Sequence, residues 1–339
     1  MSAAPRTQRQ RPRAPRAAQR GIALLVAILL VALGTMLAAA IAYENAMTAR
    51  RGASTFAFDE ALLVQQGAEA LAAFGLREVW RLSAQQPPQG GPYTYANQGW
   101  AKPLGPIEVV PGVMLEASLE DLQGRFNLNN LVNADGSADP TQLLAFQQLL
   151  TMLGLEPKWA GYTLDWISHN PTPSIPDGAK DSVYMGQNPP YRAPLRYITS
   201  ASELLALPGF GHDRYVLLAP YVAALPPRQY LNICTASGVV LDAFLGHQEF
   251  ADPQGQALAR NREAAPGCFP KKADYQAAFG TDPAAWTKVQ GELQVNSHYF
   301  RLTSFISIGS TEFNLYSLLY QDGQNAGAVR PILRSFTAD

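Results

Sequence analysis

The stretch that decides the fold is IALLVAILLVALGTMLAAAIAY, residues 22–43, which contains no charged side chain. As a helix it would rise about 33 Å at roughly 1.5 Å per residue, enough to cross the hydrocarbon core of a bilayer. Six arginines and no acid lie before it in residues 1–21, and Glu44 is the first acid of the chain. Because basic flanks stay in the cytoplasm, the sequence predicts one membrane-spanning helix with the rest of the chain on the outer side.

A secretory signal peptide is the alternative explanation, with Ala38–Ala40 as its cleavage site. The apolar run is long for a signal core, however, and no proline interrupts the chain between Ile22 and Gln86. Pro87 and Pro88 then end the helical pattern. We therefore predict that the membrane helix continues as a soluble amphipathic helix. Its buried face is expected to carry Leu71, Phe74, Leu76, Val79 and Trp80.

The charge balance and the motifs of the sequence limit the classes of function that the chain can have. The net charge is −1, and without its arginine-rich start the chain has more acids than bases, which makes it a poor partner for phosphate backbones. The segment Ser202–Phe210 resembles a helix-hairpin-helix, a motif of DNA-binding proteins, but only Arg214 follows it, beside Asp213. We expect this hairpin to serve packing and expect no nucleic-acid partner. A helix-hairpin-helix protein of DNA uptake is kept as an alternative.

A membrane-anchored periplasmic hydrolase is the other alternative. Asp242 and Glu249 are the candidate carboxylate pair for it. No nucleophile elbow, phosphate loop or zinc-ligand cluster occurs in the sequence, so we predict no catalytic residue. The four histidines are far apart and lack metal-ligand spacing: His169, His212, His247 and His298.

The residues QRGIALL, 19–25, resemble a prepilin-type leader, which joins a basic segment and a glycine to an apolar run. The resemblance implies cleavage by prepilin peptidase between Gly21 and Ile22, and N-methylation of Ile22. Most pilin-like proteins have glutamate at the fifth mature position, where this chain has Val26. The protein K family of minor pseudopilins, from the general (type II) secretion pathway, lacks this glutamate.

Further matches to the protein K family follow in order along the chain. The sequence EDLQGRFNLNNL, residues 120–131, closely resembles a signature of that family. The later matching segments are Asp165–Ile167, Asp177–Tyr184, Ser202–Leu204, Leu231–Ser237 and Arg330–Arg334. The resemblance therefore covers nearly the whole chain.

The fold class that follows is α+β. Alternating residues predict a hairpin of 107–110 with 113–119, and later strands at 299–306, 312–320 and 329–336, while 140–222 is helical in pattern. The resemblance implies a pilin-like fold, in which a long N-terminal helix packs on a small antiparallel sheet that carries a large, mainly α-helical insertion. The expected parts are a leader (1–21), a transmembrane helix (22–43), a pilin-like helix with the first strands (44–132), the inserted helical domain (133–225), and the remainder of the insertion with the last strands (226–339).

Two further sites are predicted in the exported body. Asp165, Asp177, Asp181 and Asn188 offer oxygen ligands in a loop rich in glycine and proline, which suits calcium. Family members that bind calcium in the inserted domain support this prediction, although Lys180 stands where an acid is expected; a solvated acidic loop is the alternative. Cys234 and Cys268 form an even pair in an oxidising compartment and predict one disulfide, two separate buried thiols being the alternative.

The resemblance implies a function in assembly. A minor pseudopilin of this family would form the pseudopilus tip with minor pseudopilins of the I and J classes. It would also meet the major pseudopilin, the prepilin peptidase and the inner-membrane secretion platform, and so support export of folded proteins from the periplasm across the outer membrane. The expected location is the inner membrane, single-pass, with the N-terminus cytoplasmic and the body periplasmic.

Overall fold

The computed structural model describes residues 20–85, 92–170, 172–174, 176–246, 268, 283–325 and 327–336. The chain divides into two compact units, residues 1–60 and residues 61–339. Most of the predicted leader, residues 1–19, lies outside the described residues.

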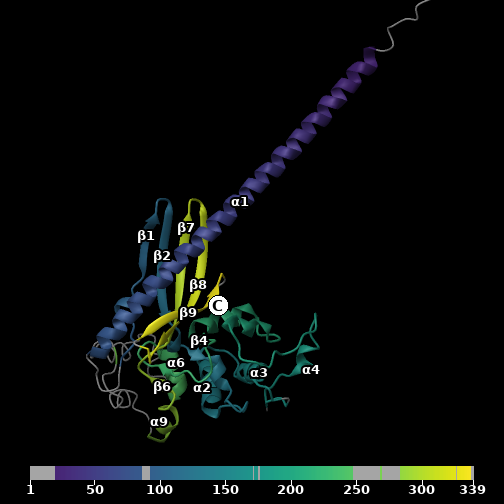
Figure 1. Ribbon diagram of the computed structural model, residues 1–339. Coiled ribbons are helices and arrows are strands. Elements are labelled where there is room, and N and C mark those ends of the chain that lie inside the picture. Colours follow the sequence, from purple (N-terminus) through teal and green to yellow (C-terminus); the bar gives the residue numbers. More distant parts are fainter. Residues whose placement is uncertain are drawn as a thin grey trace, which may run out of the picture. The chain divides into compact units, whose positions relative to one another are not determined.

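Helix α1 extends from Arg20 to Gln85 without interruption (Figure 1). Its length follows from the absence of proline in this range and from the dominance of alanine, leucine and other helix formers. The continuous helix predicted from the sequence is therefore confirmed.

A five-stranded antiparallel sheet forms the second large element, in the order β1-β2-β7-β8-β9. Its strands are β1 (Leu104–Val110), β2 (Val113–Asp121), β7 (Tyr299–Ile308), β8 (Thr311–Asp322) and β9 (Ala328–Ser335). Alternate residues of β7 and β8 are buried, as the period of two in the sequence predicts. The long N-terminal helix and the antiparallel sheet confirm the α+β, pilin-like fold class.

The last third of α1 packs on one face of this sheet. Ala61, Val64, Ala68, Ala72 and Leu76 form a stripe at helical spacing, and they lie in one buried cluster with the inward side chains of the strands. The strand members of this cluster are Val113, Leu115, Phe300, Leu302, Ile306, Leu315 and Leu319.

The predicted buried face of α1 is partly wrong. Leu76 is buried, and Val79 and Trp80 are half-buried, but Leu71 is 53% exposed and Phe74 is 70% exposed. The structure buries alanines instead, because small side chains let the helix backbone approach the sheet closely. Leu71 and Phe74 are thereby left on the outer side of the helix.

The chain between β2 and β7 builds a separate, mainly helical lobe with its own core. Its helices are α2 (Pro140–Met152), α3 (Lys158–Ile167), α4 (Asp181–Tyr184), α5 (Gly211–Leu218), α6 (Gly238–Leu245) and α9 (Pro283–Val289). Its 3-10 turns are η3 (Leu122–Gly124), η4 (Leu128–Leu131), η5 (Ala201–Ala206) and η6 (Ala219–Tyr221), and a further turn, η2 (Gly99–Ala101), precedes β1. Two short parallel pairs complete it: β3 (Phe126–Asn127) with β4 (Val222–Ala223), and β5 (Leu231–Asn232) with β6 (Leu293–Gln294).

The lobe is held by a core that is distinct from the one between α1 and the sheet. Phe126, Phe146, Trp159, Phe210 and Phe244 lie in this core, and Phe126 and Phe146 stack with their ring centres 5.1 Å apart. The domain boundaries predicted from the sequence stay predictions.

Candidate functional site

The apolar start of α1 is uncovered in its own unit. Every large apolar side chain from Ile22 to Tyr43 is exposed, between 46% for Val26 and 71% for Met36. Among the described residues this is the one helix long and apolar enough to cross a membrane. Because bare apolar surface of this extent is unfavourable in water, the segment is suited to a membrane anchor.

The asparagines of the stretch from Glu120 to Leu131 bind distant loops of the helical lobe. The Asn129 Nδ2 group donates to the carbonyls of Ile198 (2.9 Å) and Leu225 (2.7 Å), and its Oδ1 accepts from the Ile198 backbone N–H. Asn127 and Asn130 likewise donate to the carbonyls of Pro226 and Gln229. These side chains pair buried backbone groups of distant loops, so the motif serves to hold the lobe together.

Asp121, the last residue of β2, is the centre of a buried polar cluster. Its carboxylate accepts hydrogen bonds from the Gln123 backbone N–H, the Asn232 amide, the Thr235 hydroxyl and the Ser297 hydroxyl. Burial raises the pKa of Asp121, although these hydrogen bonds act in the opposite direction. The cluster joins the point where the chain enters the lobe to Ser297, just before it leaves.

The predicted calcium ligands do not gather into one site. Asp165 is buried in the last turn of α3, and Asp177 lies in a turn that precedes α4. Asp181 begins α4 and lies 3.9 Å from the Arg192 guanidinium, while Asn188 is exposed before a cis proline. No group of three or more His, Cys, Asp or Glu suited to a metal ion occurs in the part of the chain that the structure describes. The ligand set therefore does not fit calcium, which takes six to eight oxygens.

Lys180 takes the central place in this segment. Its ammonium donates to the backbone carbonyls of Asp165 (2.8 Å) and Ser168 (3.0 Å), and lies 3.8 Å from Asp165 Oδ1. Ser174 donates to the same carboxylate through its backbone N–H (3.0 Å) and its hydroxyl (2.7 Å). Burial lowers the pKa of Lys180, and the charge of Asp165 acts in the opposite direction.

Cys234 and Cys268 form a disulfide, with their Cα atoms 5.2 Å apart. Both residues are buried in the core of the lobe. The bridge joins the turn after β5 to a position 34 residues further along the chain.

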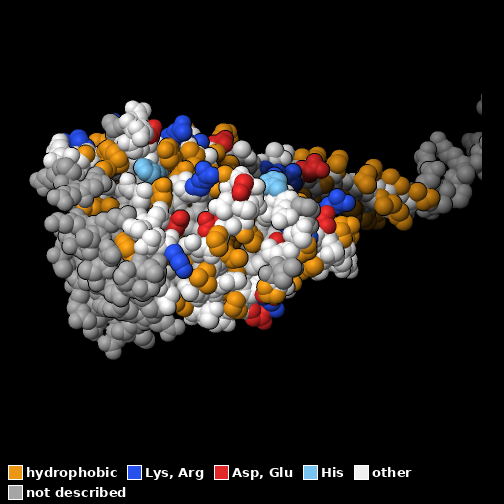
Figure 2. Space-filling model, turned by 90° about the horizontal axis from the view of Figure 1, so that it is seen from below, with side chains coloured by type: hydrophobic (Ala, Val, Ile, Leu, Met, Phe, Trp, Pro, Cys, Tyr) orange, Lys and Arg blue, Asp and Glu red, His pale blue; other side chains and the backbone are white. Residues whose placement is uncertain are grey.

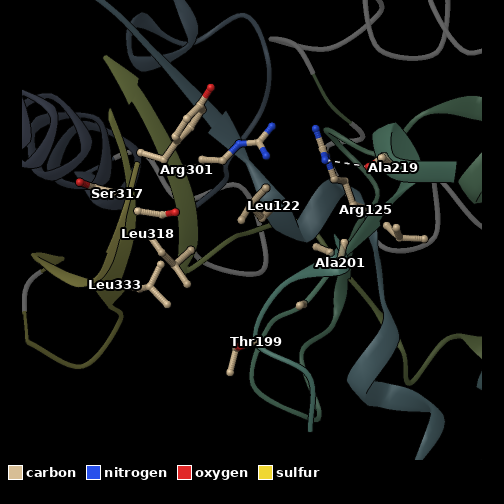
Figure 3. A pocket seen from close by; sticks show the side chains of 14 residues that line it. Leu122, Arg125, Thr199, Ala201, Ala219, Arg301, Ser317, Leu318 and Leu333 are labelled. Carbon is tan, nitrogen blue, oxygen red and sulfur yellow. Dashed lines mark hydrogen bonds between the residues drawn. The ribbon is translucent and has the colours of Figure 1, made fainter. Parts of the chain in front are cut away.

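A small cavity lies between the sheet and the lobe (Figure 3). In this view Arg301 of β7 and Leu333 of β9 face Arg125 and Ala201 of the lobe. Glu120 pairs with both guanidiniums, which therefore have a common partner. The cavity has a volume of about 30 Å³, on the order of a single water molecule.

The hairpin that resembles a DNA-binding motif is used for packing. Phe210 is fully buried and meets Trp159 edge to face, with ring centres 5.2 Å apart. Arg214, the nearby base, donates to the carbonyls of Gly209 and Phe210 and lies over the Trp159 ring. On the face drawn in Figure 2, blue and red side chains are interspersed and form no basic patch. Of the proposed hydrolase pair, Asp242 is buried in α6, and Glu249 lies outside the described residues.

A long apolar helix packed on an antiparallel sheet, with a helical lobe inserted between two paired strands, defines a pilin-like protein with an enlarged head. The model of the family described as "Type II secretion system (T2SS), protein K" matches residues 124–227. The chain is 31% identical over 327 residues to type II secretion system protein K of Pseudomonas aeruginosa, covering 94% of this chain and 93% of that protein. It is 32% identical over 325 residues to the protein of the same name from Klebsiella pneumoniae, covering 92% and 95%.

A solved structure is similar in fold. The crystal structure of the GspK-GspI-GspJ complex from enterotoxigenic Escherichia coli contains a chain that aligns with a TM-score of 0.72 at 23% identity, covering 85% of this chain and 100% of that one. The chain described here belongs to the type II secretion system protein K family, and the minor-pseudopilin class predicted from its sequence is confirmed.

Sequence reasoning missed three of the interactions that organise these sites. In the sequence Lys180 stands where an acid is expected, whereas in the structure it is the cation that Asp165 faces. The sequence likewise does not predict the buried polar cluster around Asp121. It also does not predict the ion pair between Glu69 of α1 and Arg334 of β9. The sequence signal for Lys180 is that it is the one lysine or arginine among the acids between Asp165 and Asn188.

Proposed function

We propose that this protein works as the tip subunit of a type II secretion pseudopilus. It assembles there with minor pseudopilins of the I and J classes above the major pseudopilin, and it catalyses no reaction. The observation that carries the proposal is the uncharged, exposed start of α1, with Val26 where a filament subunit carries an acid. The similarity in fold to a chain of the GspK-GspI-GspJ complex supports the choice of partners.

The first step of the proposal is removal of the leader. Prepilin peptidase cuts between Gly21 and Ile22 at the cytoplasmic side of the inner membrane, and the new amino group of Ile22 is methylated. The apolar segment then holds the protein in the membrane in a single pass, with the body in the periplasm. The arginines before Gly21 set this orientation.

In the second step, the membrane helix packs against the membrane helices of neighbouring subunits. In a filament, a carboxylate at the fifth mature position pairs with the amino group of a neighbouring subunit, and an unpaired charge in the bilayer is costly. Val26 cannot make that contact but avoids that cost. A subunit with valine here is suited to a position above which no further subunit is added.

The third step uses the helical lobe. The lobe is inserted between β2 and β7 and has its own core, so it adds bulk to the pilin-like sheet without interrupting it. That bulk would block the addition of another subunit above this one. The assembled tip then starts a filament that, with the inner-membrane secretion platform, drives folded proteins out of the periplasm.

Replacement of Gly21 tests the proposal. Gly21→Ile keeps the flank uncharged but puts a β-branched side chain at the cleavage point, so we expect the leader to persist and secretion to stop. Gly34→Ile is the matched control, because nothing lies within 4 Å of Gly34, and it should be processed normally. N-terminal sequencing of the membrane-extracted wild-type protein should begin at Ile22, and the I and J class proteins should co-purify with it. Unchanged secretion by Gly21→Ile would contradict the proposal, and so would a mature chain that begins after Ala40.

A further inference from the structure

We propose that the Lys180 ammonium is the internal cation of the segment from Asp165 to Asp181, and that this segment of the lobe folds without calcium. The side chain lies where a bound cation would lie, among the oxygens that end α3. It is 8% exposed, and Asp165 is 1% exposed. The pair therefore neutralises itself inside the protein.

The oxygens around Lys180 explain why a cation is needed at this point. The carbonyl of Asp165 lies in the last turn of α3, and that of Ser168 lies just beyond it. The last carbonyls of a helix have no partner within the helix and carry the negative end of its dipole. Two of the three ammonium N–H groups bond these carbonyls, and the third is available to the Asp165 carboxylate at 3.8 Å.

The carboxylate of Asp165 also accepts hydrogen bonds from Ser174. Ser174 donates to both oxygens, with its hydroxyl on Oδ1 and its backbone N–H on Oδ2. A Cβ atom at Gly178 would collide with Asp165 Oδ2 and with the Ser174 backbone, so the loop is closed tightly on the carboxylate. A calcium ion would have to displace both Ser174 and Lys180 from this acid.

The neighbouring Asp181 already acts on cations that the chain itself supplies, since its charge also favours the ammonium form of Lys180. Asp181 faces Arg192, with 3.9 Å between Oδ2 and Nε. One buried carboxylate and one ammonium balance in charge, whereas a divalent ion beside Lys180 would leave an excess of positive charge in a buried site.

Limited proteolysis of the full chain in detergent, with the cuts located by mass spectrometry, tests the proposal. Cleavage between residues 168 and 181 should proceed at the same rate in excess EDTA and in millimolar calcium. Lys180→Met keeps the length of the side chain but removes its charge, and it should speed cleavage there by about tenfold or more, because breaking a buried pair leaves a charge uncompensated. Lys102→Met is the matched control at an exposed lysine and should cleave as the wild type does.

A double variant separates pairing from simple packing. Asp165→Asn with Lys180→Met removes both charges, so its segment should be cut more slowly than that of Lys180→Met alone. Three results would overturn the proposal: slower cleavage of the wild-type segment in calcium than in EDTA, wild-type behaviour of Lys180→Met, or no recovery in the double variant. Should Lys180→Met fail to fold, the wild-type comparison in calcium and EDTA still decides.

Discussion

The Arg334 guanidinium of β9 forms two parallel hydrogen bonds with the Glu69 carboxylate of α1, Nε to Oε1 and Nη2 to Oε2, both at 2.7 Å. Glu69 is 5% exposed, and the Ser317 hydroxyl of β8 donates a third bond to it at 2.6 Å. Such a forked geometry is the strongest form of arginine–carboxylate contact. It attaches the last strand of the sheet to the helix, between residues 265 positions apart in sequence.

Loss of this pair should weaken the packing of the sheet on α1. Arg334→Met leaves the Glu69 carboxylate buried with Ser317 alone, and we expect the free energy of unfolding to fall by about 2 kcal/mol. Half of the Arg334 side chain is exposed, which keeps the loss below that of a fully buried pair. Urea unfolding of the full chain in detergent would measure it. Arg81→Met, which breaks the exposed pair with Glu78, is the control and should cause no measurable change.

The same pair predicts a pH dependence. Burial acts to raise the pKa of Glu69, but the hydrogen bonds from Arg334 and Ser317 and the charge of Arg334 outweigh it, so the pKa lies below its ordinary value of 4.5. A lowered pKa stabilises the folded state above that ordinary value, and this contribution is lost as the pH falls through the lowered pKa. The stability advantage of wild type over Glu69→Gln should therefore be constant at neutral pH and shrink below about pH 4.5. An advantage that is unchanged in acid would refute this assignment.

Gly161 of α3 should not tolerate a side chain. A Cβ atom there would overlap the backbone carbonyl of Asp177, which cannot move aside as a flexible side chain could. We expect Gly161→Ala to lower the free energy of unfolding by about 1–3 kcal/mol. Gly67→Ala, in α1 with nothing within 4 Å, should instead stabilise by about 0.5–1 kcal/mol. Thermal unfolding of the two variants would show shifts of opposite sign.

The disulfide between Cys234 and Cys268 should stabilise the lobe. Its removal in the double variant Cys234→Ala, Cys268→Ala is expected to cost about 2–4 kcal/mol, because the unfolded chain regains the freedom that the bridge removes. Wild-type protein should lose a similar amount in reductant, while the double variant should not respond to reductant at all. A shift in mobility between reducing and non-reducing gels would verify that the bridge is present in the purified protein.

The main elements were predictable because their signals are local. The uncharged segment 22–43 and the lack of proline up to Gln86 predict α1, and the alternation at 299–306 and 312–320 predicts β7 and β8. Pro111-Gly112 likewise predicts the turn between β1 and β2. Each of these patterns is continuous in the sequence and needs no partner from elsewhere in the chain.

What could not be predicted depends on distant partners. The buried face of α1 is decided by how closely the sheet approaches, which favours Ala68 and Ala72 over Leu71 and Phe74. No residue near Glu69 in the sequence indicates that its carboxylate pairs with Arg334, which lies 265 positions away. The acids near Asp165 suggested a metal by composition alone, but their directions in space are set by the loop that Lys180 and Ser174 close.

The chain leaves the sheet to form the lobe and returns to the sheet at one pair of opposed residues. Asp121 at the end of β2 pairs with Phe300 at the start of β7, so the chain of nearly 180 residues between them is, in topology, one very long hairpin loop. A loop whose two ends already touch can change in size or content without altering the register of the strands that carry it. Enlarging, trimming or exchanging this lobe is therefore compatible with an unchanged pairing of β2 with β7.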